Sequence, residues 1–120
     1  MKLRTLQKHN RLNSIWTTDP IGPGGAHHEY AICKSTDEQR RVLQEINFQK
    51  GARNESTSVD GILDVDLLEI VRDRLMSFQA GEYKCRDNAC ALKHIEEALM
   101  WLNKREEDRS ERGVLGTMEK

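Results

Sequence analysis

The sequence predicts an α+β fold, in which a small antiparallel β-sheet precedes a long antiparallel hairpin of two helices. Two short runs, at 28–33 and 42–49, alternate apolar with polar or small residues, a pattern typical of strands. After residue 59 the apolar residues recur every three or four positions, which is the period of an amphipathic helix. This change of period separates the predicted sheet from the predicted hairpin.

The chain of 120 residues is expected to form one domain, residues 19–120, after an N-terminal arm over residues 1–18. Within this domain we expect the sheet over 26–58 and the hairpin over 59–112. Hydrophobic residues make up 37% of the chain and charged residues 32%, so the core is thin. A thin core with amphipathic helices favours oligomer formation.

Charge and hydropathy exclude several classes of function. The formal net charge is −1, which gives none of the basic surface that binding of DNA or long RNA requires. No apolar run approaches the roughly 18 residues of a membrane span, and no signal peptide precedes the domain. We therefore expect a soluble, intracellular protein without a membrane partner.

The sheet is expected over residues 26–58, after an N-terminal arm and a turn. Residues 1–18 are basic and polar with scattered apolar positions, so a short helix and a mobile arm fit equally well. The segment 19–25 holds both prolines and predicts a turn. The strands at 28–33 and 42–49 can then pair as an antiparallel hairpin.

A polar loop at 50–58 follows the second strand and contains Arg53. This arginine fits an ordinary surface charge. It also fits an anion contact, because loop residues beside a rigid sheet commonly bind ligands. No glycine-rich phosphate-binding loop occurs in the sequence.

The first helix is predicted over 60–79. Asp60 and Asp64 suit the positive end of its dipole, and Gly81 suits the left-handed residue that ends many helices. The apolar residues with helical spacing are Leu63, Leu67, Leu68, Val71, Leu75 and Phe78.

The second helix is predicted to start near Asp87 and to reach Arg112. Asp87 or Asn88 can cap it by accepting hydrogen bonds from its first backbone N–H groups. Its apolar stripe consists of Leu92, Ile95, Leu99 and Leu102.

An aromatic and polar turn between the helices contains Phe78, Tyr83, Arg86 and Asn88. Phe78 fits both core packing and stacking on a ligand, since it lies where the helix meets the turn. Trp101, on the second helix, has the same ambiguity, and core or interface packing suits it better.

Three arginines at the end of the second helix, Arg105, Arg109 and Arg112, recur at i, i+4 and i+7 on one face. Like charges at this spacing cost a helix roughly 0.2–0.5 kcal/mol per pair. Glu106 and Asp108 can offset this cost in a solvated, salt-bridged helix end. Alternatively the guanidinium groups bind an anion, because their forked donors match phosphate oxygens.

The length of the second helix constrains any shared site. Asn88 and Arg105 lie 17 positions apart, which is about 25 Å along a helix. They cannot both touch one small ligand from the same straight helix. If both bind one molecule, they belong to different chains.

The three cysteines, Cys33, Cys85 and Cys90, are expected to be reduced thiols, because the count is odd and no secretion signal is present. Cys90 and His94 share a helix face, and the other cysteines could complete a zinc site. The paired spacing of structural zinc sites is absent, so small apolar cysteines without metal are expected instead.

The hairpin resembles the Thoeris anti-defence type 1 family of phage proteins, which shares a helical hairpin domain with the anti-CBASS type 2 family. The likeness covers roughly residues 26–117. The segments that carry it are 46–53 (INFQKGAR), 73–81 (DRLMSFQAG), 85–92 (CRDNACAL), 96–102 (EEALMWL) and 112–117 (RGVLGT).

This resemblance implies a dimer assembled into a hexamer that acts in the host cytoplasm. It implies binding of a cyclic ADP-ribose isomer made by Thoeris TIR proteins, without degradation, enzymatic activity or a cofactor. Some members of the family also bind cyclic di- or trinucleotides at a separate site.

The resemblance also implies roles for individual residues. Phe78 and Asn88 match the ligand-contacting turn, which also contains Arg86, while Arg105 and Arg109 match arginines at the helix end. Arg53 matches the strand-end arginine of the second nucleotide site. The sequence departs from the family pattern at Ala52, where proline is usual, and at Asp87, where glutamate is frequent.

Two other functions remain open from the residues alone. The apolar stripe with Trp101 and the charged helix end also fit a hairpin that docks on a host or phage protein and binds no nucleotide. A metal-stabilised regulator is the third interpretation.

Overall fold

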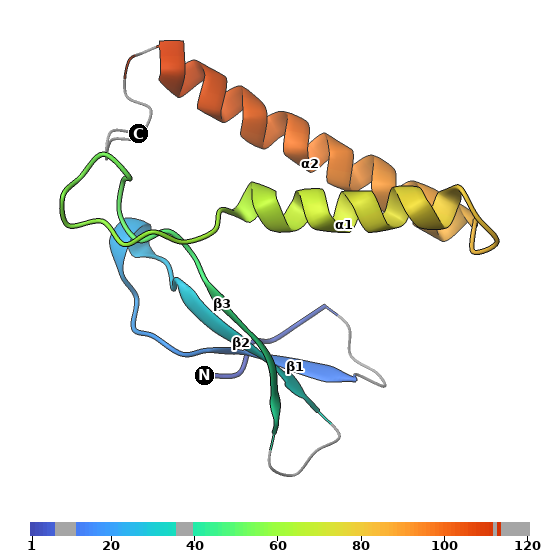
Figure 1. Cartoon of the computed structure of the whole chain (residues 1–120), viewed down its shortest axis with the longest axis horizontal. Coiled ribbons are helices and arrows are strands. Elements are labelled where there is room, and N and C mark those ends of the chain that lie inside the picture. The colour runs from blue at the N-terminus through green and yellow to red at the C-terminus, as the bar shows by residue number, and fades with distance from the viewer. Residues whose placement is uncertain (7–11, 36–39, 112, 114–120) are drawn as a thin grey trace. The chain divides into compact units, whose positions relative to one another are not determined.

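A computed structural model describes residues 1–6, 12–35, 40–111 and 113 (Figure 1). The predicted α+β class is confirmed, because three antiparallel strands precede two helices. The chain forms two compact units, Met1–Ile62 and Leu63–Lys120. The elements are β1 (Asn13–Thr17), a 3₁₀ helix (Pro23–Gly25), β2 (Glu29–Lys34), β3 (Val42–Asn47), α1 (Asp64–Gln79) and α2 (Arg86–Glu111).

The sheet has the order β1-β2-β3, and both pairs of neighbours are antiparallel. The predicted hairpin of β2 and β3 is confirmed, with Tyr30 opposite Ile46. Strand β1 was not predicted, since its residues had been assigned to a short helix or an arm. Ser14 and Thr17 are its buried residues, while Trp16 is only half-buried, so β1 lacks the alternation that marks a strand in sequence.

The core of the sheet unit is small. Among the described residues, Ala31 and Cys33 are its buried apolar residues, which confirms that Cys33 packs as a small apolar side chain. Tyr30 and Phe48 add an edge-to-face contact with ring centroids 5.7 Å apart. Backbone hydrogen bonds from the first three residues extend the pairing along β1.

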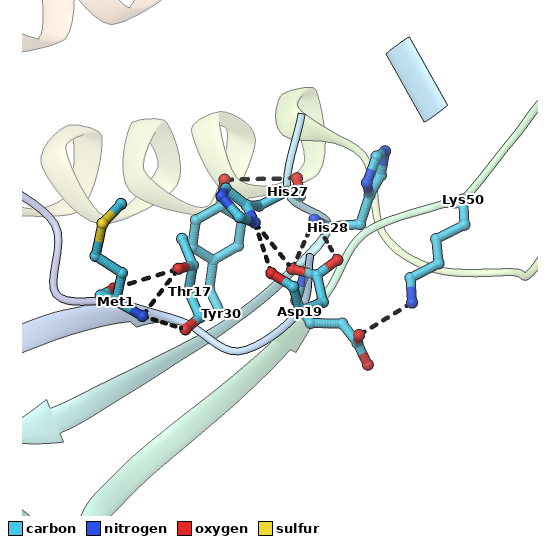
Figure 2. Close-up of polar contacts among 8 residues, drawn as sticks. Met1, Thr17, Asp19, His27, His28, Tyr30 and Lys50 are labelled. Carbon is cyan, nitrogen blue, oxygen red and sulfur yellow. Dashed lines mark hydrogen bonds and ion pairs between the residues drawn. The ribbon is translucent and has the colours of Figure 1, made fainter. Parts of the chain in front are cut away.

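Asp19 ties the proline- and glycine-rich turn to the start of β2 (Figure 2). Its carboxylate accepts hydrogen bonds from the backbone N–H groups of His28 (3.0 Å) and Glu29 (3.1 Å) and lies 3.5 Å from Nδ1 of His27. Burial raises the pKa of Asp19, but these N–H groups and the charges of His27 and Lys50 outweigh burial and lower it overall.

The helical unit consists of α1 and α2, which run side by side in opposite directions (Figure 1). The predicted apolar stripe of α2 is half-buried. Arg72 on α1 donates a hydrogen bond of 2.8 Å from Nε to Glu96 on α2. This ion pair is a polar contact between the two helices.

The predicted boundaries of the helices need correction. Helix α1 begins at Asp64, and Asp60 lies outside it. The carboxylate of Asp66 accepts a 2.8 Å hydrogen bond from the backbone N–H of Leu63, which fixes this start. Beyond the C-terminal end of α2, Gly113 has a left-handed φ of 73°, as expected for a chain that leaves a helix at glycine.

The paired helices leave much apolar surface exposed. No described residue of either helix is fully buried, and the exposed fraction is 71% for Met100 and 65% for Trp101. Soluble monomers rarely expose large apolar side chains that lie close together. No helix in the described part of the chain is long and apolar enough to cross a bilayer.

Candidate ligand-binding site

The turn between the helices closes with short-range hydrogen bonds. Ala80 is still right-handed (φ −86°, ψ −7°), and the Gly81 N–H donates to the Phe78 carbonyl over 3.2 Å. The φ of Gly81 is not positive, so the prediction that Gly81 is left-handed is wrong. The chain leaves α1 through 3₁₀-type bonds, and these do not require a positive φ at the glycine.

The start of α2 also differs from the prediction. The helix begins at Arg86, and Sγ of Cys85 lies 3.4 Å from the backbone N–H of Asn88. Cys85 is thus the capping residue, and the assignment of that role to Asp87 or Asn88 is wrong. The short side chains of these two residues suggested a cap, but the turn places them already inside the helix.

The amide group of Asn88 supports the turn. Its Nδ2 donates a hydrogen bond of 3.3 Å to the carbonyl of Tyr83. Across the turn, Oε1 of Gln79 accepts a 3.0 Å hydrogen bond from the backbone N–H of Cys85. These two side-chain bonds hold the loop, and Oδ1 of Asn88 has no hydrogen-bond partner among the described residues.

Two aromatic rings and an arginine form one cluster at this turn. The rings of Phe78 and Tyr83 have centroids 6.5 Å apart and an interplanar angle of 72°. The guanidinium carbon of Arg74 lies 5.4 Å from the Phe78 centroid. Sequence reasoning missed Arg74, although its i, i+4 spacing to Phe78 is the signal that could have found it.

Phe78 is 36% exposed and Tyr83 is 70% exposed, so neither ring belongs to a core of the single chain. Arg86 is exposed as well and is the first residue of α2. A cation at that end opposes the helix dipole. Its position therefore offers the helix no stabilisation.

Arg105 and Arg109 lie in the last two turns of α2, about 25 Å and about 32 Å along the helix from Asn88. The expected salt bridge from Arg105 to Asp108 is absent, because Asp108 pairs instead with Lys104 at 3.0 Å. Arg105 is exposed and has no hydrogen-bond or ion-pair partner among the described residues.

Arg109 is half-buried and is a basic residue in the last turn of α2, where the helix dipole favours a cation. Arg112, the third arginine of the predicted series, lies outside the described residues. Because α2 is continuous, the structure keeps the turn and the arginines of one chain apart.

Arg53 belongs to the sheet unit, where its guanidinium is held in place. Nε and Nη2 donate to Oε1 of Gln49 at 3.2 and 2.9 Å, and Nη2 also donates to the carbonyl of Gly61 at 3.3 Å. Asp60 lies 3.9 Å away. The side chain is 61% exposed, so a fixed cation faces solvent beside the strand end.

The cysteines are all free thiols. Cys85 and Cys90 are exposed, which is unlike the small apolar packing that we expected for all three. In the part of the chain that the structure describes, no group of three or more His, Cys, Asp or Glu side chains is arranged to hold a metal ion.

Side chains of α2 line an open hollow. Met100 and Trp101 are its apolar lining residues, and the other lining residues are charged. The lining residues are Lys93, Glu96, Glu97, Met100, Trp101 and Lys104.

The structure thus brings some of the predicted site residues together at the turn and places the others far from it in the same chain. Tyr83 joins Phe78 and Asn88 in one turn, through its ring and its carbonyl respectively. Arg105 and Arg109 lie at the opposite end of the same helix.

Comparison with known proteins places this hairpin in a family. The chain is 49% identical over 78 residues to a protein of Bacillus phage SBSphiJ7 named Thoeris anti-defense 1. The match covers 65% of this chain and 54% of the relative, so the chain spans about half the length of that protein. The family model of the Acb2/Tad1 hairpin domain matches residues 40–105, from the last strand through most of α2. This chain belongs to the Acb2/Tad1 hairpin-domain family.

Proposed function

We propose that this protein is a phage immune-evasion sponge, which means that it binds and hides a signalling nucleotide without degrading it. Membership of the hairpin family and the likeness to a Thoeris anti-defense protein support a role against Thoeris. The proposed ligand is a cyclic ADP-ribose isomer made by a Thoeris TIR protein. The proposed place of action is the host cytoplasm.

The observation that carries this proposal is the division of the hairpin into two complementary ends. One end offers exposed aromatic rings and the acceptor oxygen of Asn88 on a turn held by side-chain hydrogen bonds. The other end offers Arg105, an exposed cation without a carboxylate partner among the described residues. Adenine, ribose and diphosphate need these kinds of group: a stacking surface, a hydrogen-bonding group and cations.

The two ends can serve one ligand only if two chains contribute. Antiparallel pairing of hairpins places the turn of one chain near Arg105 and Arg109 of its partner. The exposed apolar side chains of Met100 and Trp101 supply surface for such pairing. We therefore propose a homodimer as the binding unit, with assembly into a hexamer.

Phe78 would stack on the adenine, and Asn88 would accept a hydrogen bond from the ligand. Arg86, the first residue of α2, would add a cation next to the turn. Arg105 and Arg109 of the partner chain would bind the diphosphate. No covalent step is required, so the ligand is expected to leave the protein unchanged.

Native mass spectrometry of the protein with cyclic ADP-ribose isomers from a Thoeris TIR reaction tests this proposal. We expect ligand on the oligomer, and intact ligand in solution after heat denaturation. Recovery of a linear product would instead indicate an enzyme. Absence of ligand from the oligomer would reject the sponge.

Matched variants locate the site. Arg105→Gln should weaken binding about ten- to hundredfold, the usual cost of a lost charge-assisted hydrogen bond. Arg41→Gln removes the same charge from an exposed position in the sheet unit and should leave the dissociation constant unchanged. Equal effects of both variants would reduce the role of Arg105 to general electrostatics.

Arg53 supports a second proposal, a separate site for cyclic di- or trinucleotides. Gln49 and the Gly61 carbonyl orient its guanidinium, which lowers the entropy cost of binding a phosphate. Arg53→Gln should abolish binding of these nucleotides and leave binding of the cyclic ADP-ribose isomer intact. Loss of both ligands together would argue against separate sites.

The apolar hollow also favours an alternative function, docking of the hairpin on a host or phage protein. In that case the purified protein should be a monomer in light scattering and should bind no nucleotide. A Trp101→Glu chain would lose the partner. If the wild type is instead an oligomer and Trp101→Glu dissociates it, the hollow pairs with a second copy of this chain.

A further inference from the structure

We infer that Tyr83 is a second aromatic contact of the ligand site, whose ring meets a base stacked on Phe78 edge to face, and that its phenol hydroxyl is a polar contact for the ligand. This inference rests on the proposed function and assigns Tyr83 a direct role in it. The geometry that leads to it is the arrangement of Tyr83, Phe78, Arg74 and Asn88 at the turn.

Accessibility distinguishes the two rings. Tyr83 is 70% exposed, whereas Phe78 is 36% exposed. Phe78 is flanked by the guanidinium of Arg74 at 5.4 Å and by the Tyr83 ring at 6.5 Å between centroids. Because the ring planes differ by 72°, one base cannot lie flat on both rings, so a base stacked on Phe78 would meet the more exposed Tyr83 ring edge to face.

The backbone of Tyr83 is held in place although its ring is exposed. Its carbonyl accepts the hydrogen bond from Nδ2 of Asn88, and the bond from Cys85 N–H to Gln79 closes the same loop. An aromatic side chain with two rotatable bonds on a fixed backbone loses little entropy on binding. Water contact with a large ring has no benefit for folding, so its placement here fits recognition of a flat ligand.

The hydroxyl group adds a polar function. The Tyr83 hydroxyl has no hydrogen-bond partner among the described residues, in contrast to Tyr30, whose hydroxyl lies 3.5 Å from the His27 carbonyl. A free phenol next to a stacking surface can donate to a ribose or phosphate oxygen. The Tyr83 side chain would thus contact both the base and the sugar-phosphate part of one nucleotide.

Fluorine NMR can test the contact directly, because the chain has only two tyrosines. Labelling with 3-fluorotyrosine gives two resonances, and the Tyr30→Phe chain assigns the one from Tyr83. Saturation with cyclic ADP-ribose isomers from a Thoeris TIR reaction should shift the Tyr83 resonance by the ring current of adenine. The Tyr30 resonance, from the sheet unit, serves as the internal control.

Affinity measurements then separate the ring contact from support of the turn. Tyr83→Leu should weaken binding about 2- to 13-fold, which corresponds to the ~0.5–1.5 kcal/mol of an edge-to-face aromatic contact. Tyr83→Phe keeps the ring and should recover most of that loss, with the remainder assigned to the hydroxyl. Both variants are compared with the wild type by isothermal titration at a temperature where circular dichroism shows each fully folded.

The outcomes distinguish this inference from the proposed function. If the wild type binds the ligand while the Tyr83 resonance stays unshifted and Tyr83→Leu binds normally, Tyr83 has no direct role and the sponge stands. If the wild type binds no cyclic ADP-ribose isomer, both the sponge and the role of Tyr83 are rejected.

Discussion

Gly61 lies where the chain returns to the end of β3, and replacing it with alanine tests how closely the two segments approach. An ideal Cβ at Gly61 would lie 2.5 Å from the carbonyl carbon of Phe48, 2.6 Å from the oxygen of Asn47 and 2.7 Å from the nitrogen of Gln49. All three are backbone atoms, so no side-chain rotation can relieve the overlap.

The magnitude follows from the displacement that alanine would require. Moving the closest atom from 2.5 Å to the ordinary contact distance of 3.4 Å needs a shift of 3.4 − 2.5 = 0.9 Å. Such a shift breaks the bonds from Ile62 N–H to Asn47 (3.0 Å) and from Gln49 N–H to Ile62 (2.9 Å). Two lost hydrogen bonds and the overpacking together cost about 2–4 kcal/mol.

Amide hydrogen exchange provides the assay, because it reports local opening. Gly61→Ala should accelerate exchange at Gln49 and Ile62 by about 30- to 700-fold, which is the equivalent of ~2–4 kcal/mol. Gly81→Ala is the matched control. There the nearest atom, the Ser77 oxygen, is 3.8 Å from the added Cβ and φ is not left-handed.

Gly81→Ala should therefore be neutral or stabilise the hairpin by up to about 1 kcal/mol. If Gly61→Ala leaves exchange at Gln49 and Ile62 as slow as in the wild type, the close approach of the two segments is wrong. The fixed orientation of Arg53, which depends on the Gly61 carbonyl, would then lose its support as well.

Three further predictions concern the turn, the shared site and acid stability. The lowered pKa of Asp19 stabilises the folded protein above its ordinary value of 3.8, and this contribution disappears as the pH falls from that value through the folded-state pKa. The urea concentration at the midpoint of unfolding, measured between pH 2 and 7, should therefore fall less steeply with decreasing pH in Asp19→Asn than in the wild type. An equally steep fall would contradict this assignment. Asn88→Asp places a carboxylate against the Tyr83 carbonyl in place of the amide donor. Titration should then show at least tenfold weaker ligand binding. Unaltered affinity would mean that ligand binding does not need this hydrogen bond. Phe78→Ala and Arg109→Ala chains should each bind poorly alone but regain a fraction of sites when co-expressed, because some interfaces then pair an intact turn with intact arginines. If subunit exchange is demonstrated and titration still finds no high-affinity sites, the two-chain pocket is wrong.

The sequence predicted most of the hairpin because its signals are local. The repeat of Leu92, Ile95, Leu99 and Leu102 follows directly from the helical period, and the structure half-buries all four. The same holds for the pair of strands β2 and β3, in which Tyr30 faces Ile46. The length of α2, and with it the separation of Asn88 from Arg105, also follows from an uninterrupted helical pattern.

Other features could not be read from the sequence, because they depend on partners distant in the chain or on choices among equivalent local bonds. Strand β1 forms because its backbone pairs with the edge of β2, although its own side chains do not alternate between apolar and polar. By helical spacing Asp108 can reach Lys104, Arg105 and Arg112, and among the described residues it pairs with Lys104 rather than Arg105. Either pairing satisfies the helical spacing, so composition and period cannot choose between them.

The turn shows most clearly which features the sequence predicts and which only the tertiary structure decides. Its residue types alone indicated an aromatic and polar turn with Phe78, Tyr83, Arg86 and Asn88, and the family resemblance implied a ligand site there. The structure decided that Gly81 is not left-handed, that Cys85 caps α2 and that Asn88 holds the Tyr83 carbonyl. The physical reason is that several short polar side chains compete for the same unpaired backbone groups, and only the folded path of the loop brings one of them within hydrogen-bonding distance.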